Sequence, residues 1–272
     1  MATVVLLDSD AAGLRPVGGA RIGERWQRLA LGGLFLVVLF AAWELEAVLG
    51  LEPSIVLPSP AEVLAAFGDL FTSPDIWADF AASGQEFLYG FALATVVGIV
   101  LGLAVGWYVW LGYLVDPFVM FLYAIPRVAL APLLIVWLGI GMSSKVALVF
   151  LTAVFSVLIN TSSGIRSLDS NLLRVARCFG ASDLQIFRTI ALPGSVPFIL
   201  GGLRLAVGQA LIAVFVAELL GAQHGIGAMI ENAGQQFETA TVFGGLVIFA
   251  IAGMALSTIV RWLERRFDAW RL

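Results

Sequence analysis

The sequence predicts an all-α integral membrane protein, a bundle of about six transmembrane helices. Its 272 residues are 60% hydrophobic and only 12% charged, whereas soluble domains average about 25% charged and about 45–50% apolar residues. The apolar residues cluster into runs of about 20, the length that crosses the hydrocarbon core of a bilayer. The arginines gather between alternate runs, as is typical of loops that stay in the cytoplasm.

Six runs have the length and composition of a membrane span. In chain order they cover residues 29–49, 87–111, 117–139, 146–161, 196–220 and 242–263. The first follows several arginines, as a signal peptide would. It is longer than a signal core of about 7–15 residues and further spans follow, so we expect it to be retained.

Small residues and prolines mark two of these spans. Gly98, Gly102 and Gly106 recur every four residues in the second, a spacing that lets a neighbouring helix approach closely and is also typical of ordinary helix packing. The third contains Pro126 and Pro132, each of which should kink the helix because proline lacks a backbone donor.

The basic residues indicate the orientation. Of fifteen, thirteen lie on one side: Arg15, Arg21, Arg25 and Arg28 before the first span; Arg166, Arg174, Arg177, Arg188 and Arg204 in or beside the segment after the fourth; Arg261, Arg265, Arg266 and Arg271 at the end. Residues 50–85 and 221–241 contain neither Lys nor Arg. Because basic loops stay inside, we expect both ends in the cytoplasm, residues 1–28 as a tail and residues 29–272 as one transmembrane domain.

The segment after the first span should contain a helix on the outer face. Ser59, Pro60 and Glu62 form a helix start, with a hydroxyl cap, a proline in the first turn and a glutamate that completes a capping box. The apolar residues that follow, as far as Phe71, predict an amphipathic surface helix.

The segment between the fourth and fifth spans, residues 164–194, predicts two short helices. On the first helix, Leu172, Leu173, Ala176 and Phe179 share one face, and Arg174 and Arg177 lie on another. Gly180 suits the left-handed residue that ends a helix. Ser182 with Gln185 begins the second helix, and Leu192-Pro193-Gly194 should stop it. Such a pair of helices either forms a protruding surface that another protein binds or covers the cytoplasmic end of the bundle.

These same residues carry a family resemblance. Arg174-Val175-Ala176, then Gly180 after three residues and Ile190-Ala191-Leu192-Pro193 after nine more, have the spacing of the EAA loop. Residues 124–133, 137–141, 201–206 and 216–221 extend the similarity over nearly all of the chain after residue 29. The chain resembles the permeases of binding-protein-dependent ABC importers, in the branch that imports nitrate, sulfonates, taurine or bicarbonate.

The resemblance implies a type I importer permease with its coupling loop within residues 164–194, in a bacterial inner membrane. It implies a homodimer, two cytoplasmic ATP-binding cassette subunits that bind ATP and magnesium, and an extracytoplasmic solute-binding protein. The residues that would couple to the ATPase are Arg174, Val175, Ala176, Arg177, Phe179, Gly180, Ala181, Ser182 and Asp183. One departure is Arg174, because the family loop usually begins with Glu, so the docking contact there must differ.

Several classes of function are excluded or disfavoured. No GxxxxGK[ST] phosphate loop occurs, so energy must come from another subunit and we expect no cofactor in this chain. One Cys, Cys178, and one His, His224, leave the usual metal and nucleophile constellations incomplete. The net charge of −4 argues against nucleic acid as a partner; membrane lipid is the expected surrounding.

Polar residues inside spans are the candidates for the solute pathway, because an unpaired group there is costly. Arg127 lies near the middle of the third span, where its guanidinium could attract an anion or form an ion pair with Glu218. Arg127 could also snorkel to an interface. Glu218 could instead lie near the outer interface. Asn160 and Gln209 are further candidates, although amides also bond across helices for packing.

Two other classes compete with an importer subunit. A secondary transporter or channel would work without an ATPase and often shows an internal repeat and paired ionisable groups in its spans. An integral-membrane enzyme would require clustered His, Asp or Glu near one interface. Neither pattern is evident in the sequence.

Overall fold

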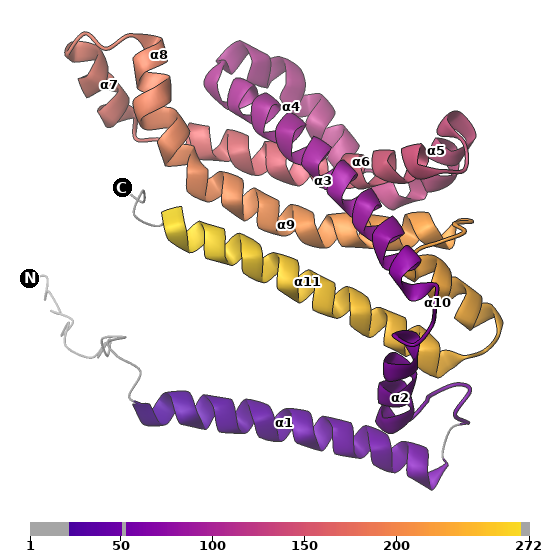
Figure 1. Cartoon of the computed structure of the whole chain (residues 1–272). Helices are drawn as coiled ribbons and strands as arrows, with labels where there is room; N and C mark the ends of the chain where they lie inside the picture. The colour runs from indigo at the N-terminus through magenta and orange to yellow at the C-terminus, as the bar shows by residue number, and fades with distance from the viewer. Residues whose placement is uncertain (1–21, 51–52, 268–272) are drawn as a thin grey trace, which may run out of the picture. The chain divides into compact units, whose positions relative to one another are not determined.

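The computed structural model describes residues 22–50 and 53–267, and the regular structure of these residues is entirely helical (Figure 1). The chain divides into two compact units, residues 1–53 and 54–272. The first unit contains α1 (Ile22–Leu49), within which Leu29–Leu49 has the length and composition of a span. Most of the predicted cytoplasmic tail, residues 1–21, lies outside the described residues.

The second unit is a helical bundle. Its elements are α2 (Pro60–Leu70), α3 (Ile76–Trp107), α4 (Val109–Ala124), the 3-10 turn η1 (Arg127–Leu130), α5 (Ala131–Leu138), α6 (Met142–Arg166), α7 (Ser170–Cys178), α8 (Asp183–Ile186), the π turn η2 (Phe187–Ala191), α9 (Leu192–Leu219), α10 (Ile226–Gln235) and α11 (Thr239–Phe267). In the described part of the chain, five helical segments could cross a membrane, or six if the bent pair α4–α5 forms one span.

The core of the second unit forms where α6 packs between α3 and α9. A row of glycines on α3 makes the α3–α6 contact unusually close. A Cβ built on Gly90, Gly98, Gly102 or Gly106 would lie 2.5–2.7 Å from the Cβ of Val149, Val157, Thr161 or Ile165, respectively. The close approach predicted from the four-residue glycine spacing is therefore confirmed, and it allows tight van der Waals packing.

The same contacts fix the direction of the two helices. Each partner on α6 is 59 positions beyond its glycine on α3 (149 − 90, 157 − 98, 161 − 102 and 165 − 106). Because both numbers rise together, α3 and α6 run parallel. The chain between Trp107 and Met142 must therefore return across the bundle, which supports counting α4 and α5 as one crossing and the chain as six-spanning.

The predicted third span, residues 117–139, is not a single kinked helix. α4 and α5 meet at 83° and are separated by Ile125, Pro126 and η1. Ile125 is extended, with ψ of 134°, because the ring of a following proline disfavours the helical region. Pro132 lies in the first turn of α5, where a missing N–H costs little. Pro126 thus breaks the helix, whereas the kink predicted at Pro132 is wrong.

The predicted stop at Leu192-Pro193-Gly194 is also wrong. Residues 183–219 form one continuous helical segment through α8, η2 and α9. The N–H of Leu192 donates to the Phe187 carbonyl five residues earlier, so η2 widens the helix by one residue. Pro193 follows in the first turn of α9. The π turn therefore carries the chain past the proline without ending the helix.

The helix predicted to begin at Ser59 is confirmed as α2. Glu62 N–H donates to Ser59 Oγ at 3.1 Å, and Ser59 N–H donates to the Glu62 carboxylate at 2.8 Å, which completes the capping box. Leu70 is buried, and α2 packs against α11 beside Gly244. This end of the bundle is thus closed by a helix outside the spans.

We predict that Gly102→Leu disrupts the bundle. A side chain at Gly102 would meet the Leu158 carbonyl oxygen, 2.8 Å from the added Cβ, as well as Thr161, and overpacking costs about 1–3 kcal/mol or more. Gly84→Leu is the matched control, because Gly84 lies in the same helix and its Cβ would meet nothing within 4 Å. The measurement is the melting temperature of the purified protein in detergent. Equal melting temperatures for the two variants would contradict the close α3–α6 contact.

Candidate functional site

The two predicted short helices form a hairpin, residues 169–186, at the α6–α9 connection (Figure 1). Gly180 ends α7 with φ of 79°. Its N–H donates to the Arg177 carbonyl at 2.9 Å, and the Ala181 N–H donates to the Ala176 carbonyl at 3.1 Å, the Schellman pattern. Ser182 and Gln185 then form a capping box on α8. Both local predictions, the left-handed glycine and the second helix start, are confirmed.

The hairpin presents apolar side chains on its surface. No residue of α7 is buried, and Phe179 at the tip is 87% exposed. Val175 and Leu184 are also exposed. Large apolar side chains that remain exposed together on a surface often mark a contact with another protein. The surface of the hairpin is therefore suited to such a contact.

The arginines of the hairpin lie on its exposed surface. Arg174 donates to the side-chain oxygen of Asn171 at 2.6 Å, within the same helix. Arg177 pairs with Asp183 across the turn at 3.6 Å. Exposed pairs of this kind contribute little to stability, so both guanidinium groups can exchange these partners for those of another protein.

The hairpin is connected rigidly to the bundle. α8 continues through η2 into α9 without a break, and Ile186 and Ala191 are buried. Phe187 also packs edge-on against Trp107 at the end of α3, with ring centroids 5.2 Å apart. A displacement of the hairpin would therefore move α9 directly and α3 through this contact.

A buried polar network lies at the opposite end of α3. Asp79, Ser83 and Glu86 occupy positions i, i+4 and i+7, so they share one face of the helix. Asp79 accepts from the Gly225 N–H and Ser83 from the Ile226 N–H, both at 2.9 Å. These bonds satisfy free N–H groups at the start of α10, where acceptors and negative charge are favourable.

Glu218 joins this network and is fully buried. Its two carboxylate oxygens accept from the Ser83 hydroxyl at 2.5 Å and from the Gly227 N–H at 2.7 Å. Glu218 is the second-last residue of α9, and the helices α3, α9 and α10 enclose it, so it is buried in protein; its predicted place near the outer interface stays a prediction. The predicted ion pair with Arg127 is absent from the described contacts.

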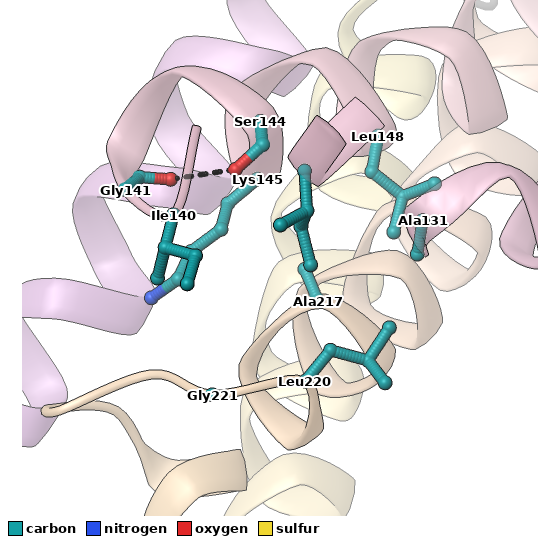
Figure 2. Close-up of a pocket in the computed structure, with 10 residues that line it drawn as sticks. Ala131, Ile140, Gly141, Ser144, Lys145, Leu148, Ala217, Leu220 and Gly221 are labelled. Carbon is teal, nitrogen blue, oxygen red and sulfur yellow. Dashed lines mark hydrogen bonds between the residues drawn. The ribbon is translucent and has the colours of Figure 1, made fainter. Parts of the chain in front are cut away.

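Glu86 pairs with Lys145 of α6 at 2.5 Å, with side chains only 1% and 13% exposed. Figure 2 shows Lys145 beside Ile140 and Gly141, near a cavity of about 10 Å³ that is also lined by Ala217 of α9 and by Leu220, which follows α9. The sequence interpretation missed this pair, because the second span was predicted to begin at Phe87. Two features of the sequence could have revealed the pair. Asp79, Ser83 and Glu86 share one helix face before Phe87, and Lys145 is an isolated lysine directly before the predicted fourth span.

Arg127 lies at the α4–α5 break. Its guanidinium stacks on the Tyr123 ring, 4.6 Å from the centroid, and lies 5.9 Å from that of Phe155. One N–H donates to the Thr152 carbonyl at 3.4 Å. Among the ion pairs of the described residues none includes Arg127, so the predicted structural ion pair is not formed here.

Comparison with known proteins identifies the family. The sequence profile of the family described as "Binding-protein-dependent transport system inner membrane component" matches residues 94–271. The Bacillus subtilis protein named as an aliphatic sulfonates transport permease, SsuC, is 34% identical over 271 residues, 98% of each chain. The chain belongs to this family of importer permeases.

Other relatives of the permease are named for different substrates. The taurine transport system permease protein TauC of Escherichia coli is 31% identical, over 92% of this chain and 94% of its own. The riboflavin transport system permease protein RibX of Chloroflexus aurantiacus is 33% identical, over 91% and 92%. Identity alone therefore does not separate a sulfonate permease from a riboflavin permease.

A solved structure agrees with the permease fold. A bacterial ABC transporter involved in the import of the acidic polysaccharide alginate aligns with a TM-score of 0.61 at 18% identity, covering 90% of this chain and 97% of that one. At this identity the match bears on the fold alone, and it confirms the importer-permease bundle predicted from the sequence.

Asn160 and Gln209 of the permease lie on facing helices. Gln209 accepts from the Ser156 hydroxyl at 2.8 Å across the α6–α9 contact, a bond that also serves packing. Asn160 donates to the Ser156 carbonyl at 2.8 Å and lines a cavity of about 590 Å³ with Arg204 and Glu264. The pathway roles of Asn160, Gln209 and Glu218 stay predictions. Among the described residues, no group of three or more His, Cys, Asp or Glu side chains could hold a metal ion.

Proposed function

We propose that this permease is the membrane subunit of an ATP-driven importer of small sulfonates, of the taurine and short aliphatic type, in a bacterial inner membrane. Two copies would pair with two cytoplasmic ATPase subunits, which bind ATP and magnesium, and an extracytoplasmic binding protein would deliver the solute. The observation that carries the coupling part is the exposed hairpin joined without a break to α9.

The hairpin would act as the contact with the ATPase. Phe179 and Val175 supply apolar area, and Arg177 and Asp183 supply charge that can be re-paired. When the ATPase dimer closes on ATP, its movement would pass through α8 and η2 into α9, and through Phe187 to Trp107 of α3. Rigid displacement of packed helices is the usual basis of alternating access.

Two observations support sulfonates as the solute class. Permeases named for aliphatic sulfonates and taurine are similar over more than nine-tenths of the chain. The unpaired Arg127 also favours an anionic group over a neutral heterocycle such as riboflavin. Nitrate and bicarbonate, the other solutes of the predicted branch, are less directly supported.

We predict that the cognate binding protein binds taurine or a short alkanesulfonate far more tightly than nitrate, bicarbonate or riboflavin. The measurement is isothermal titration of that protein with each solute, followed by uptake of the tightest one by cells that express the whole system. Preferential binding of riboflavin or another neutral solute would contradict the sulfonate assignment and leave the importer assignment intact. Uptake without an ATPase would contradict the importer assignment itself.

A further inference from the structure

The Arg127 guanidinium is partly buried and reaches the middle of α6. It contacts the Thr152 carbonyl, and Thr152 is ten residues after the start of α6 and fourteen before its end. At about 1.5 Å per residue, this level is about 15 Å from one end of α6 and about 21 Å from the other. The midpoint of α6 is Val154, so Arg127 contacts this helix about 3 Å from its middle, and a helix of this length is sufficient to cross a bilayer core of roughly 30 Å.

Three other basic side chains of the spans have carboxylate partners, and the remaining ones, Arg188, Arg261, Arg265 and Arg266, lie within six residues of a span end. Lys145 pairs with Glu86, Arg166 with Asp116 and Arg204 with Glu264. Arg127 has a single long hydrogen bond and two aromatic contacts. The planar group therefore retains several N–H donors and a positive charge that no carboxylate of α3–α11 neutralises.

No carboxylate of α3–α11 forms an ion pair with Arg127. The carboxylates within α3, α4, α9 and α11 all have other partners: Asp79, Glu86, Asp116, Glu218 and Glu264. Glu86 is level with Lys145, seven residues or about 10 Å along α6 from Thr152.

An unpaired arginine at this depth is costly, by about 2.5–3.5 kcal/mol on insertion scales. Ionisable residues inside membrane spans are therefore usually functional. Its fork of donors matches two oxygens of an oxyanion, and the two aromatic rings hold the fork in position without neutralising it. The long bond to Thr152 can be exchanged for a stronger, charge-assisted one when an anion arrives.

We propose that the Arg127 guanidinium at the α4–α5 break binds the sulfonate group of the solute as it crosses the membrane. The inference rests on the proposed function and names its intramembrane site. Arg127 is the first residue of η1, directly after the break at Ile125 and Pro126, and from there its guanidinium reaches the Thr152 carbonyl of α6. Binding by one residue is weak enough for the solute to leave, as conduction requires.

The test uses the complete importer, this chain with its ATPase and binding protein, in proteoliposomes. Uptake of radiolabelled taurine is measured beside ATP hydrolysis stimulated by the taurine-loaded binding protein. We expect Arg127→Gln to lower uptake about tenfold or more, the equivalent of one lost charge-assisted hydrogen bond. ATP hydrolysis should keep its stimulation, since the hairpin is unchanged. Arg166→Gln, which removes a paired arginine, is the matched control and should change uptake less than about twofold.

Arg127→Lys separates recognition from folding. Lysine keeps the charge and can keep the aromatic contact but lacks the fork, so we expect the protein to fold with a raised KM for taurine uptake. Wild-type uptake in both variants would overturn the proposal, as would a loss in Arg127→Gln that Arg127→Lys restores fully. If wild-type proteoliposomes import no sulfonate at all, the proposed function fails instead, so the two failures are distinguishable.

Discussion

Gly180→Trp is expected to abolish solute uptake while the chain still folds and inserts. Gly180 has φ of 79°, where any L residue is strained, and a Cβ added to it would meet nothing within 4 Å, so the substitution strains the hairpin turn locally without a steric clash of the Cβ. The tryptophan side chain would cover the hairpin tip beside Phe179, the surface proposed to enter the ATPase. Loss of a central interface contact costs about 2 kcal/mol or more, roughly a thirtyfold loss of affinity.

The measurement compares taurine uptake with the amount of ATPase that copurifies with the permease in detergent. Gly180→Asn is the matched control, because asparagine tolerates the left-handed conformation better than other residues and is small. We expect it to keep most of the uptake. Normal uptake by Gly180→Trp would show that the hairpin does not couple to the ATPase.

Lys145→Met is expected to cause the largest loss of stability. Glu86 is 1% exposed and pairs with Lys145 at 2.5 Å. Removal of the lysine leaves a buried carboxylate without its partner, which costs about 3–5 kcal/mol. At roughly 2–4 °C per kcal/mol for a chain of this size, the melting temperature should fall by about 6–20 °C.

The double variant Glu86→Leu/Lys145→Met distinguishes the lost pair from lost packing. Replacement of a whole buried ion pair by apolar residues is often neutral, so we expect the double variant to melt close to wild type. Arg166→Met is the control for an exposed pair and should change stability by less than about 1 kcal/mol. If the double variant were as unstable as Lys145→Met, the loss of stability would not come from the unpaired Glu86 carboxylate.

Much of the fold was predictable from local sequence. Helix length and apolar composition predicted the spans, and the capping boxes at Ser59 and Ser182 were confirmed atom by atom. Gly180 was predicted to be left-handed for a local steric reason, and it is. The errors arose at prolines, because the effect of a proline depends on the turn around it: Pro126 breaks a helix, Pro132 begins one and Pro193 follows a π turn.

The sequence by itself determined the membrane character, the arginine-rich side, the hairpin and the family resemblance, since each is written in neighbouring residues or in simple periodicity. Only the tertiary structure decided which distant side chains meet. Ser83 binds Glu218 from 135 residues away and Glu86 binds Lys145 from 59. Arg127 was recognisable as a charge in a span, but its lack of a carboxylate partner depends on how α4, α5 and α6 pack. Hydrogen bonds and ion pairs act over a few ångströms, so packing must first bring their atoms together.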